Sequence, residues 1–148
     1  MALASVALQK AVYERLANDT ELTALIGTGK VFDYVPDGTT APFVVIGDDG
    51  DGETLNFQFT DLEEDVHELT MTFHTFTEAP RGRLAVKQIL SRLHDLLIAE
   101  VILLEEFVLI TVDFVAAQVL RDEDSLTYHG VFRCRCVVRP ANIIGMED

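Results

Sequence analysis

Residues 107–139 read FVLITVDFVAAQVLRDEDSLTYHGVFRCRCVVR, two runs of alternating side chains on either side of a charged turn. Alternation with a period of two is typical of strands with one buried face, and two such runs around a short polar connection predict an antiparallel hairpin. In the second run, the alternation places Phe132, Cys134 and Cys136 on one face. We expect that face to be buried and the other face to carry a basic stripe, which consists of Arg133, Arg135 and Arg139.

The segments before this hairpin predict further strands and helices. Short runs rich in β-branched and aromatic residues predict strands at residues 31–35, 43–46 and 69–76. Apolar residues at helical spacing predict an amphipathic helix over Leu8–Leu16, a short helical turn over Leu22–Ile26 and a longer helix that runs from Pro80 through Leu84 to Leu97. This order predicts an α+β fold in which two main helices pack on one face of a mostly antiparallel sheet.

The size and charge of the chain restrict its function. Its 148 residues carry a formal charge of −14, with 25 acidic and 11 basic side chains, and 49% of them are hydrophobic. A chain of this length buries enough surface for one core, so we expect a single domain over residues 1–148. Proteins that grip nucleic acid neutralise phosphates with Lys and Arg, which this composition disfavours. Because no signal peptide is recognisable and Glu100 interrupts the longest apolar run, we expect a protein made in the cytoplasm with no membrane partner.

The segment at residues 48–68 differs in character from the rest of the chain. It contains nine acidic side chains and no Lys or Arg, so we expect a solvated arm shaped like a β-hairpin. Within it, three apolar residues alternate with polar ones: Leu55, Phe57 and Phe59. These side chains either fold back on the chain's own core or dock on a neighbouring subunit.

In this sequence, the residue types that form known catalytic and cofactor sites do not occur at the spacing that such sites require. Gly27–Lys30 is similar to a phosphate loop, but Val31 stands where the motif requires Ser or Thr. Residues 49–53 are similar to a calcium loop but lack its Gly at the sixth position. Cys134 and Cys136 share one strand face without further cysteines, which indicates two buried thiols rather than a metal site. We therefore expect no enzyme activity, no metal and no cofactor.

Four segments spread over nearly the whole chain carry more specific motifs: Leu8–Ala11, Val31–Pro36, Pro42–Gly47 and Asp124–Arg135. The third reads Pro-aromatic-Val-x-Ile-Gly, and the fourth reads Asp-x-x-Thr-x-His-Gly-x-x-Arg. In this order the segments resemble the tail-completion, or tail-terminator, family of long-tailed bacteriophages and gene transfer agents. Neither motif is catalytic.

The resemblance implies a structural virion protein that forms a ring, typically a hexamer, at the head-proximal end of the tail tube and joins the tube to the neck. Its implied partners are copies of itself, the tail tube protein and the neck or head-closure protein, with DNA passing through the lumen without specific binding. Such a protein is made and assembled in the bacterial host cytoplasm and resides in the tail and neck of the particle. An acidic lumen suits a DNA conduit, because carboxylates repel phosphate. The alternatives are a head-closure or stopper protein of the same neck, and a small cytoplasmic α+β ligand-binding domain or enzyme.

A ring of acidic subunits needs attractive contacts that offset the repulsion between its members. We predict that the arginine stripe supplies them, because guanidinium groups pair bidentately with carboxylates. Its expected partners, within or between subunits, are carboxylates of the arm and of the hairpin turn, which contains Asp122, Glu123 and Asp124.

Overall fold

The structure of the chain is a computed structural model, and it describes residues 4–47, 60–63, 66–78, 80–121 and 126–141. Two of the predicted features lie outside these residues. One is the alternating run of Leu55, Phe57 and Phe59, and the other is the acidic turn of Asp122, Glu123 and Asp124. Of the predicted arm, only residues 60–63 and 66–68 are described, where they pair as antiparallel strands.

The described residues form three helices, which are α1 (Ala4–Ala17), α2 (Thr20–Ile26) and α3 (Arg83–His94), and α3 continues into a π-helical turn, η1 (Asp95–Ala99). They also form six strands, which are β1 (Val31–Phe32), β2 (Phe43–Ile46), β3 (Thr60–Glu63), β4 (Val66–Glu78), β5 (Phe107–Arg121) and β6 (Thr127–Pro140).

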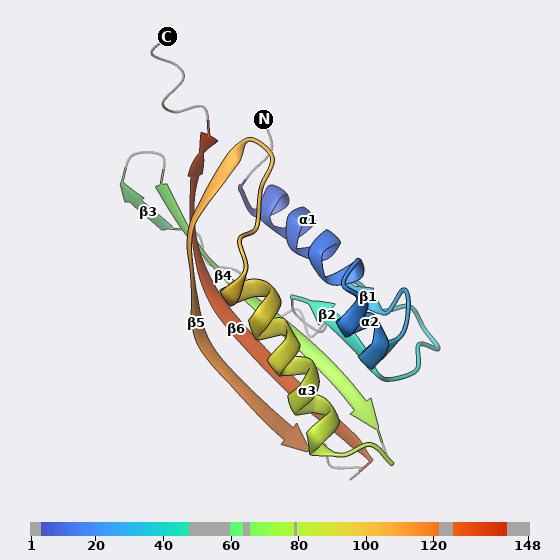
Figure 1. The fold of residues 1–148 in the computed structure, drawn as a ribbon. Coiled ribbons are helices and arrows are strands. Elements are labelled where there is room, and N and C mark those ends of the chain that lie inside the picture. The colour runs from blue at the N-terminus through green and yellow to red at the C-terminus, as the bar shows by residue number, and fades with distance from the viewer. Residues whose placement is uncertain (1–3, 48–59, 64–65, 79, 122–125, 142–148) are drawn as a thin grey trace.

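The strands form one sheet in the order β1-β2-β4-β6-β5, and β3 pairs with the beginning of β4. β1 and β2 run parallel, whereas every other pair is antiparallel. The predicted hairpin is present as β5 and β6, which curve together along the length of the molecule (Figure 1). These findings confirm the α+β fold with a mostly antiparallel sheet.

The helices cover one face of the sheet, and the core lies between the two layers (Figure 1). α1 contributes Leu8, Val12 and Leu16 to this core, and α3 contributes Ile89 and Leu93. The sheet supplies Phe73, Phe132, Cys134, Cys136 and Val138, all buried. The two cysteines are free, and the neighbouring Cys136 thiol together with burial raises the pKa of the Cys134 thiol, which keeps it protonated and unreactive.

Local details differ from the sequence-based expectation. α3 begins at Arg83 rather than at Pro80, and Gly82 occupies its N-cap position. Leu84 was expected on the buried stripe of this helix but is exposed. The reason is that the buried stripe passes through Val86 and Leu93, which lie on the opposite side of the helix from residue 84.

The first predicted strand is shorter than residues 31–35, because only Val31 and Phe32 pair with β2. After Phe32 the chain leaves the sheet, and Asp33 accepts a hydrogen bond from the Gln9 side chain of α1 at 3.4 Å. β2 is buried at three of its four positions, in agreement with its uniformly apolar sequence.

Candidate assembly surface

The face of the sheet opposite the helices carries the predicted arginine stripe. Arg133 and Arg135 are exposed there, because they alternate along β6 with the buried cysteines. Arg135 Nε lies 3.1 Å from Oε2 of Glu68 in β4, an intrachain ion pair with an acidic residue of the predicted arm. Arg139 is half-buried and donates from Nη1 to the Pro140 carbonyl at 3.2 Å. Arg133 makes no ion pair within the described part of the chain, so its charge is available to a partner.

Beyond the arginines, the same face carries a row of rings that the sequence did not predict. Phe43, Phe76 and His129 lie on three neighbouring strands, with ring centroids 5.2 Å apart for the first pair and 4.4 Å for the stacked second pair. His74 Nδ1 lies 2.7 Å from His129 Nε2, so one ring donates an N–H to the other. The two histidines lie far apart in the sequence, and only the register of β4 and β6 brings them together.

Strand β5 forms one edge of the sheet, and its outer side pairs with no strand that the structure describes. Edge strands of soluble proteins usually carry charges or Pro that block pairing with another chain. β5 has only two charged residues, Asp113 and Arg121, and it exposes Ile110, Val115 and Leu120. The outer edge of this 15-residue strand is therefore suited to pairing with a strand of another chain.

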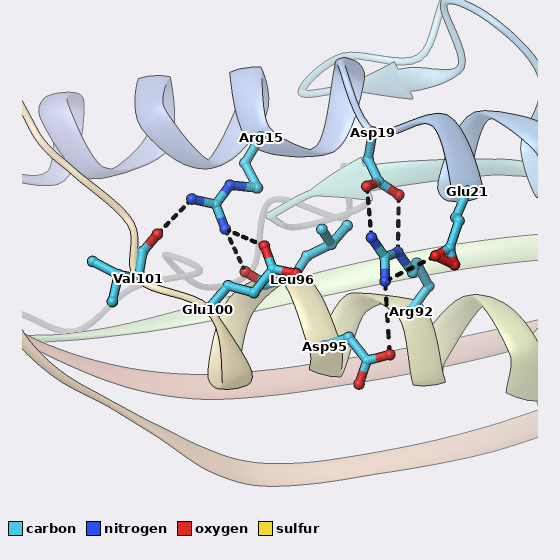
Figure 2. Close-up of polar contacts among 8 residues, drawn as sticks. All are labelled: Arg15, Asp19, Glu21, Arg92, Asp95, Leu96, Glu100 and Val101. Atoms are coloured by element: carbon cyan, nitrogen blue, oxygen red, sulfur yellow. Dashed lines mark hydrogen bonds and ion pairs between the residues drawn. The ribbon is translucent and has the colours of Figure 1, made fainter.

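Two arginines hold the helical layer together, and Figure 2 shows both. Arg92 of α3 forms a bidentate pair with Asp19, from Nε to Oδ2 at 2.9 Å and from Nη2 to Oδ1 at 2.7 Å. Asp19 also caps α2, because its Oδ2 accepts the Leu22 N–H at 2.8 Å. Both charged side chains are largely shielded from solvent. The Arg92 guanidinium therefore holds the pKa of the Asp19 carboxyl below its usual value of 3.8.

Replacement of Asp19 with Asn should destabilise the fold at neutral pH, and the loss should disappear in acid. Since the pKa of this carboxyl is lowered by folding, its contribution is fully present above pH 3.8 and is lost as the pH falls through the lower value of the folded state. Urea unfolding of the wild type and of Asp19→Asn at pH 7, 4 and 2.5 measures the difference.

The Ala variant serves as the matched comparison, because Asn keeps a side-chain oxygen that can cap α2. Asp19→Ala should cost about 1 kcal/mol more than Asp19→Asn at every pH, the usual contribution of an N-cap residue. A difference between wild type and Asp19→Asn that stays constant down to pH 2.5 would contradict the assigned ion pair.

The second arginine fixes the chain that follows η1. Arg15 of α1 donates from Nη1 to the Leu96 carbonyl at 3.2 Å and to Glu100 Oε1 at 3.1 Å, and from Nη2 to the Val101 carbonyl (Figure 2). One guanidinium thus holds three points of a segment far away in the sequence. Residues 100 and 101 are therefore tethered to α1 before the chain enters β5.

In the described ranges, no three His, Cys, Asp or Glu side chains are placed to hold a metal ion together. No helix among these residues combines the length and the apolar character needed to cross a membrane.

Comparison with known proteins gives a consistent result. Residues 10–139 of this chain match the protein family "Tail completion protein gp17". The tail completion protein gp17 of Bacillus phage SPP1 is 29% identical over 136 residues, which cover 92% of this chain and 95% of that protein. The solved structure of bacteriophage SPP1 gp17 superposes with a TM-score of 0.61 at 31% identity, over 91% of each chain.

A chain in the virion of a native gene transfer agent particle has the same fold, with a TM-score of 0.76 at 24% identity over 94% of this chain and 99% of that one. The match of the family over residues 10–139 confirms the resemblance seen in the four motifs, and with it a structural tail protein of bacteriophage type rather than an enzyme. The chain belongs to the tail completion protein gp17 family.

Proposed function

We propose that this chain is a tail terminator, which forms a ring at the head-proximal end of the tail tube and joins the tube to the neck. The observation that carries the proposal is the match of residues 10–139 to the tail completion family. The related chain in the gene transfer agent virion supports a place in the assembled particle. The partners are other copies of the chain, most simply as a hexamer, the tail tube protein and the neck protein.

Two features of the surface support a ring. The unpaired, apolar edge of β5 is suited to being covered by another chain, and Arg133 offers a cation without an intrachain ion pair in the described part. We infer that the stripe of Arg133, Arg135 and Arg139 contacts carboxylates of a neighbouring subunit. Those carboxylates include the turn of Asp122, Glu123 and Asp124, while Leu55, Phe57 and Phe59 supply apolar contacts.

The charge of the chain supports the passage of DNA through the ring. With a net charge of −14 for each copy, a lumen that presents carboxylates repels the phosphates of the duplex. This repulsion acts only within about 8–10 Å in physiological salt, so it prevents binding to the wall without opposing transport over a longer range. A lining of Lys and Arg would instead retain DNA.

The test mixes the purified chain with tubes assembled from the tail tube protein of the same particle. Electron microscopy is expected to show a ring at one end of each tube, and light scattering to give the mass of a closed oligomer. Binding to the neck protein without binding to tubes would contradict the proposed role and identify a head-closure protein instead.

The same experiment with Arg133→Glu and Arg135→Glu together tests the stripe. We expect the oligomer mass and the capped tubes to be lost, because the change turns attraction between subunits into repulsion. Lys30→Glu with Arg81→Glu makes the same charge change away from the stripe and should leave the oligomer intact. An unchanged oligomer in the first variant would assign the stripe to contacts within one chain.

A further inference from the structure

A groove between α3 and β5 has no role in the contacts described so far. It lies on the helical side of the sheet and has a volume of about 610 Å³. Its apolar lining includes Leu90, Phe114, Val119 and Phe132. Arg83 and Lys87 of α3 also line it and are exposed, and no described residue that lines it is acidic. In a chain of net charge −14, this groove suits a segment that combines apolar side chains with carboxylates.

The chain itself contains such a segment at residues 100–106, between η1 and β5. Its Leu103 and Val101 side chains are 84% and 79% exposed, the highest values for large apolar residues in the described part. They stand on either side of Ile102, which is buried in the core. The carboxylates of the segment are Glu100, Glu105 and Glu106.

The segment is held in one conformation, which lowers the entropy cost of binding. Arg15 binds the Val101 carbonyl and the Glu100 carboxylate, as Figure 2 shows. At the other end, the Ala141 N–H donates to the Glu106 carbonyl at 2.8 Å. The Lys10 Nζ lies 3.5 Å from Glu105 Oε1. Because both ends are fixed, the exposure of Val101 and Leu103 is built into the fold.

A chain cannot place this segment in its own groove. The segment enters β5 at Phe107, whereas the groove residues of that strand are Phe114, Ala117 and Val119. A strand rises about 3.3 Å per residue, so Ala117 lies roughly 30 Å along β5 from Phe107. Figure 1 shows the corresponding arrangement, with the loop after η1 at one end of β5 and α3 alongside its other half.

We propose that residues 100–106 of one copy dock in the groove between α3 and β5 of a second copy, with Val101 and Leu103 against its apolar lining and the Glu106 carboxylate facing Arg83 and Lys87. The proposal rests on the ring proposed above and names the surfaces that join its members. The two surfaces differ, so each subunit inserts its segment into the groove of one neighbour and receives the segment of another neighbour in its own groove. Such a head-to-tail contact closes into a ring when the rotation between subunits allows it. The neighbour then also covers the exposed Phe114 and part of the β5 edge.

Two variants test the proposal, each of which damages one of the two surfaces. The segment variant carries Val101→Ser with Leu103→Ser, and the groove variant carries Arg83→Glu with Lys87→Glu. All four side chains are exposed, and the one specific side-chain contact among them in the described part of the chain is that of the Arg83 guanidinium, which lies 5.5 Å from the centre of the Tyr128 ring. Such an exposed cation–π contact contributes little to stability, so both variants should still unfold cooperatively close to the midpoint of the wild type. By light scattering, each is expected to lose the oligomer and to have the mass of one chain, 16.4 kDa.

A mixture of the two variants gives the decisive result. The groove of the segment variant is intact, and so is the segment of the groove variant, so the two should combine into a dimer of twice 16.4 kDa and no larger species. Tyr34→Ser is the matched control, because it removes a side chain that is 78% exposed from another surface, and it should keep the full oligomer.

The outcomes separate this inference from the proposed function. The docking proposal would be overturned if rings persisted in both variants, or if the variants fell to monomers and did not combine on mixing. In either case, wild-type rings on tubes would leave the proposed function standing. A wild type that forms no ring, in solution or on tubes, would overturn the proposed function and, with it, the role of this contact.

Discussion

The Phe132→Ala variant is expected to lose about 3–5 kcal/mol of unfolding free energy, the usual cost of removing a buried phenyl ring. Phe132 is fully buried in β6, where its ring lies 6.1 Å from that of Phe73 in β4 and 5.4 Å from that of Phe114 in β5. The His94 ring of α3 is 6.4 Å away. The cavity left by Ala would therefore border three strands and a helix. Urea unfolding at a fixed protein concentration measures the loss, since assembly would add to the apparent stability.

Phe114→Ala is the matched control for this prediction. It removes the same ring from the neighbouring strand, but from a side chain that is 46% exposed, so it should cost less than half as much. Equal losses for the two variants would show that Phe132 is not at the centre of the core. Both rings line the groove, but only that of Phe114 is exposed to a docked partner, so its variant is expected to weaken oligomers more than Phe132→Leu does.

Gly130→Ala is expected to destabilise the chain by about 1–3 kcal/mol through overpacking. A methyl group at this position of β6 would lie 2.6 Å from Cγ1 of Val86 in α3 and 2.8 Å from Cγ2 of Thr75 in β4. Both distances are shorter than van der Waals contact, so α3 would have to move away from the sheet. Urea unfolding measures the loss, and hydrogen exchange in α3 should increase as its packing loosens.

A double variant checks the cause of this effect. Val86→Ala removes the closest clashing atom, so the loss in Gly130→Ala with Val86→Ala should be smaller than the sum of the two single losses. Gly82→Ala is the control for steric overlap, because a methyl group there meets nothing within 4 Å, and its loss should be limited to the preference of the α3 N-cap for Gly over Ala. Additive losses in the double variant would contradict a clash between Gly130 and α3.

The clash at Gly130 gives a physical reason for part of the motif seen in the sequence. In the His129-Gly130 pair, Gly130 permits the close approach of α3 to β6, while His129 points to the other face, where it stacks on Phe76. Neither residue needs to perform chemistry for its type to matter. The motif therefore describes how the two layers of the fold pack, which suits a structural protein.

The arginine stripe and the groove show which parts of the candidate surfaces could be predicted from the sequence and which could not. The stripe could be predicted, because alternation along one strand fixes which side chains share a face. The pairing of Arg135 with Glu68 could not, because it depends on the register of β6 against β4. The groove escaped prediction for the same reason, since its residues come from α3, β5 and β6.

By itself, the sequence determined the nature and order of the main elements, the buried face of β6 and the family. The period of apolar residues is a local property, so it can be read from one segment at a time. Only the tertiary structure decided that β1 and β2 run parallel, that His74 meets His129 and that Leu103 is exposed beside a buried Ile102. These features depend on which distant segments become neighbours, and that choice follows from the packing of the whole chain rather than from any single segment.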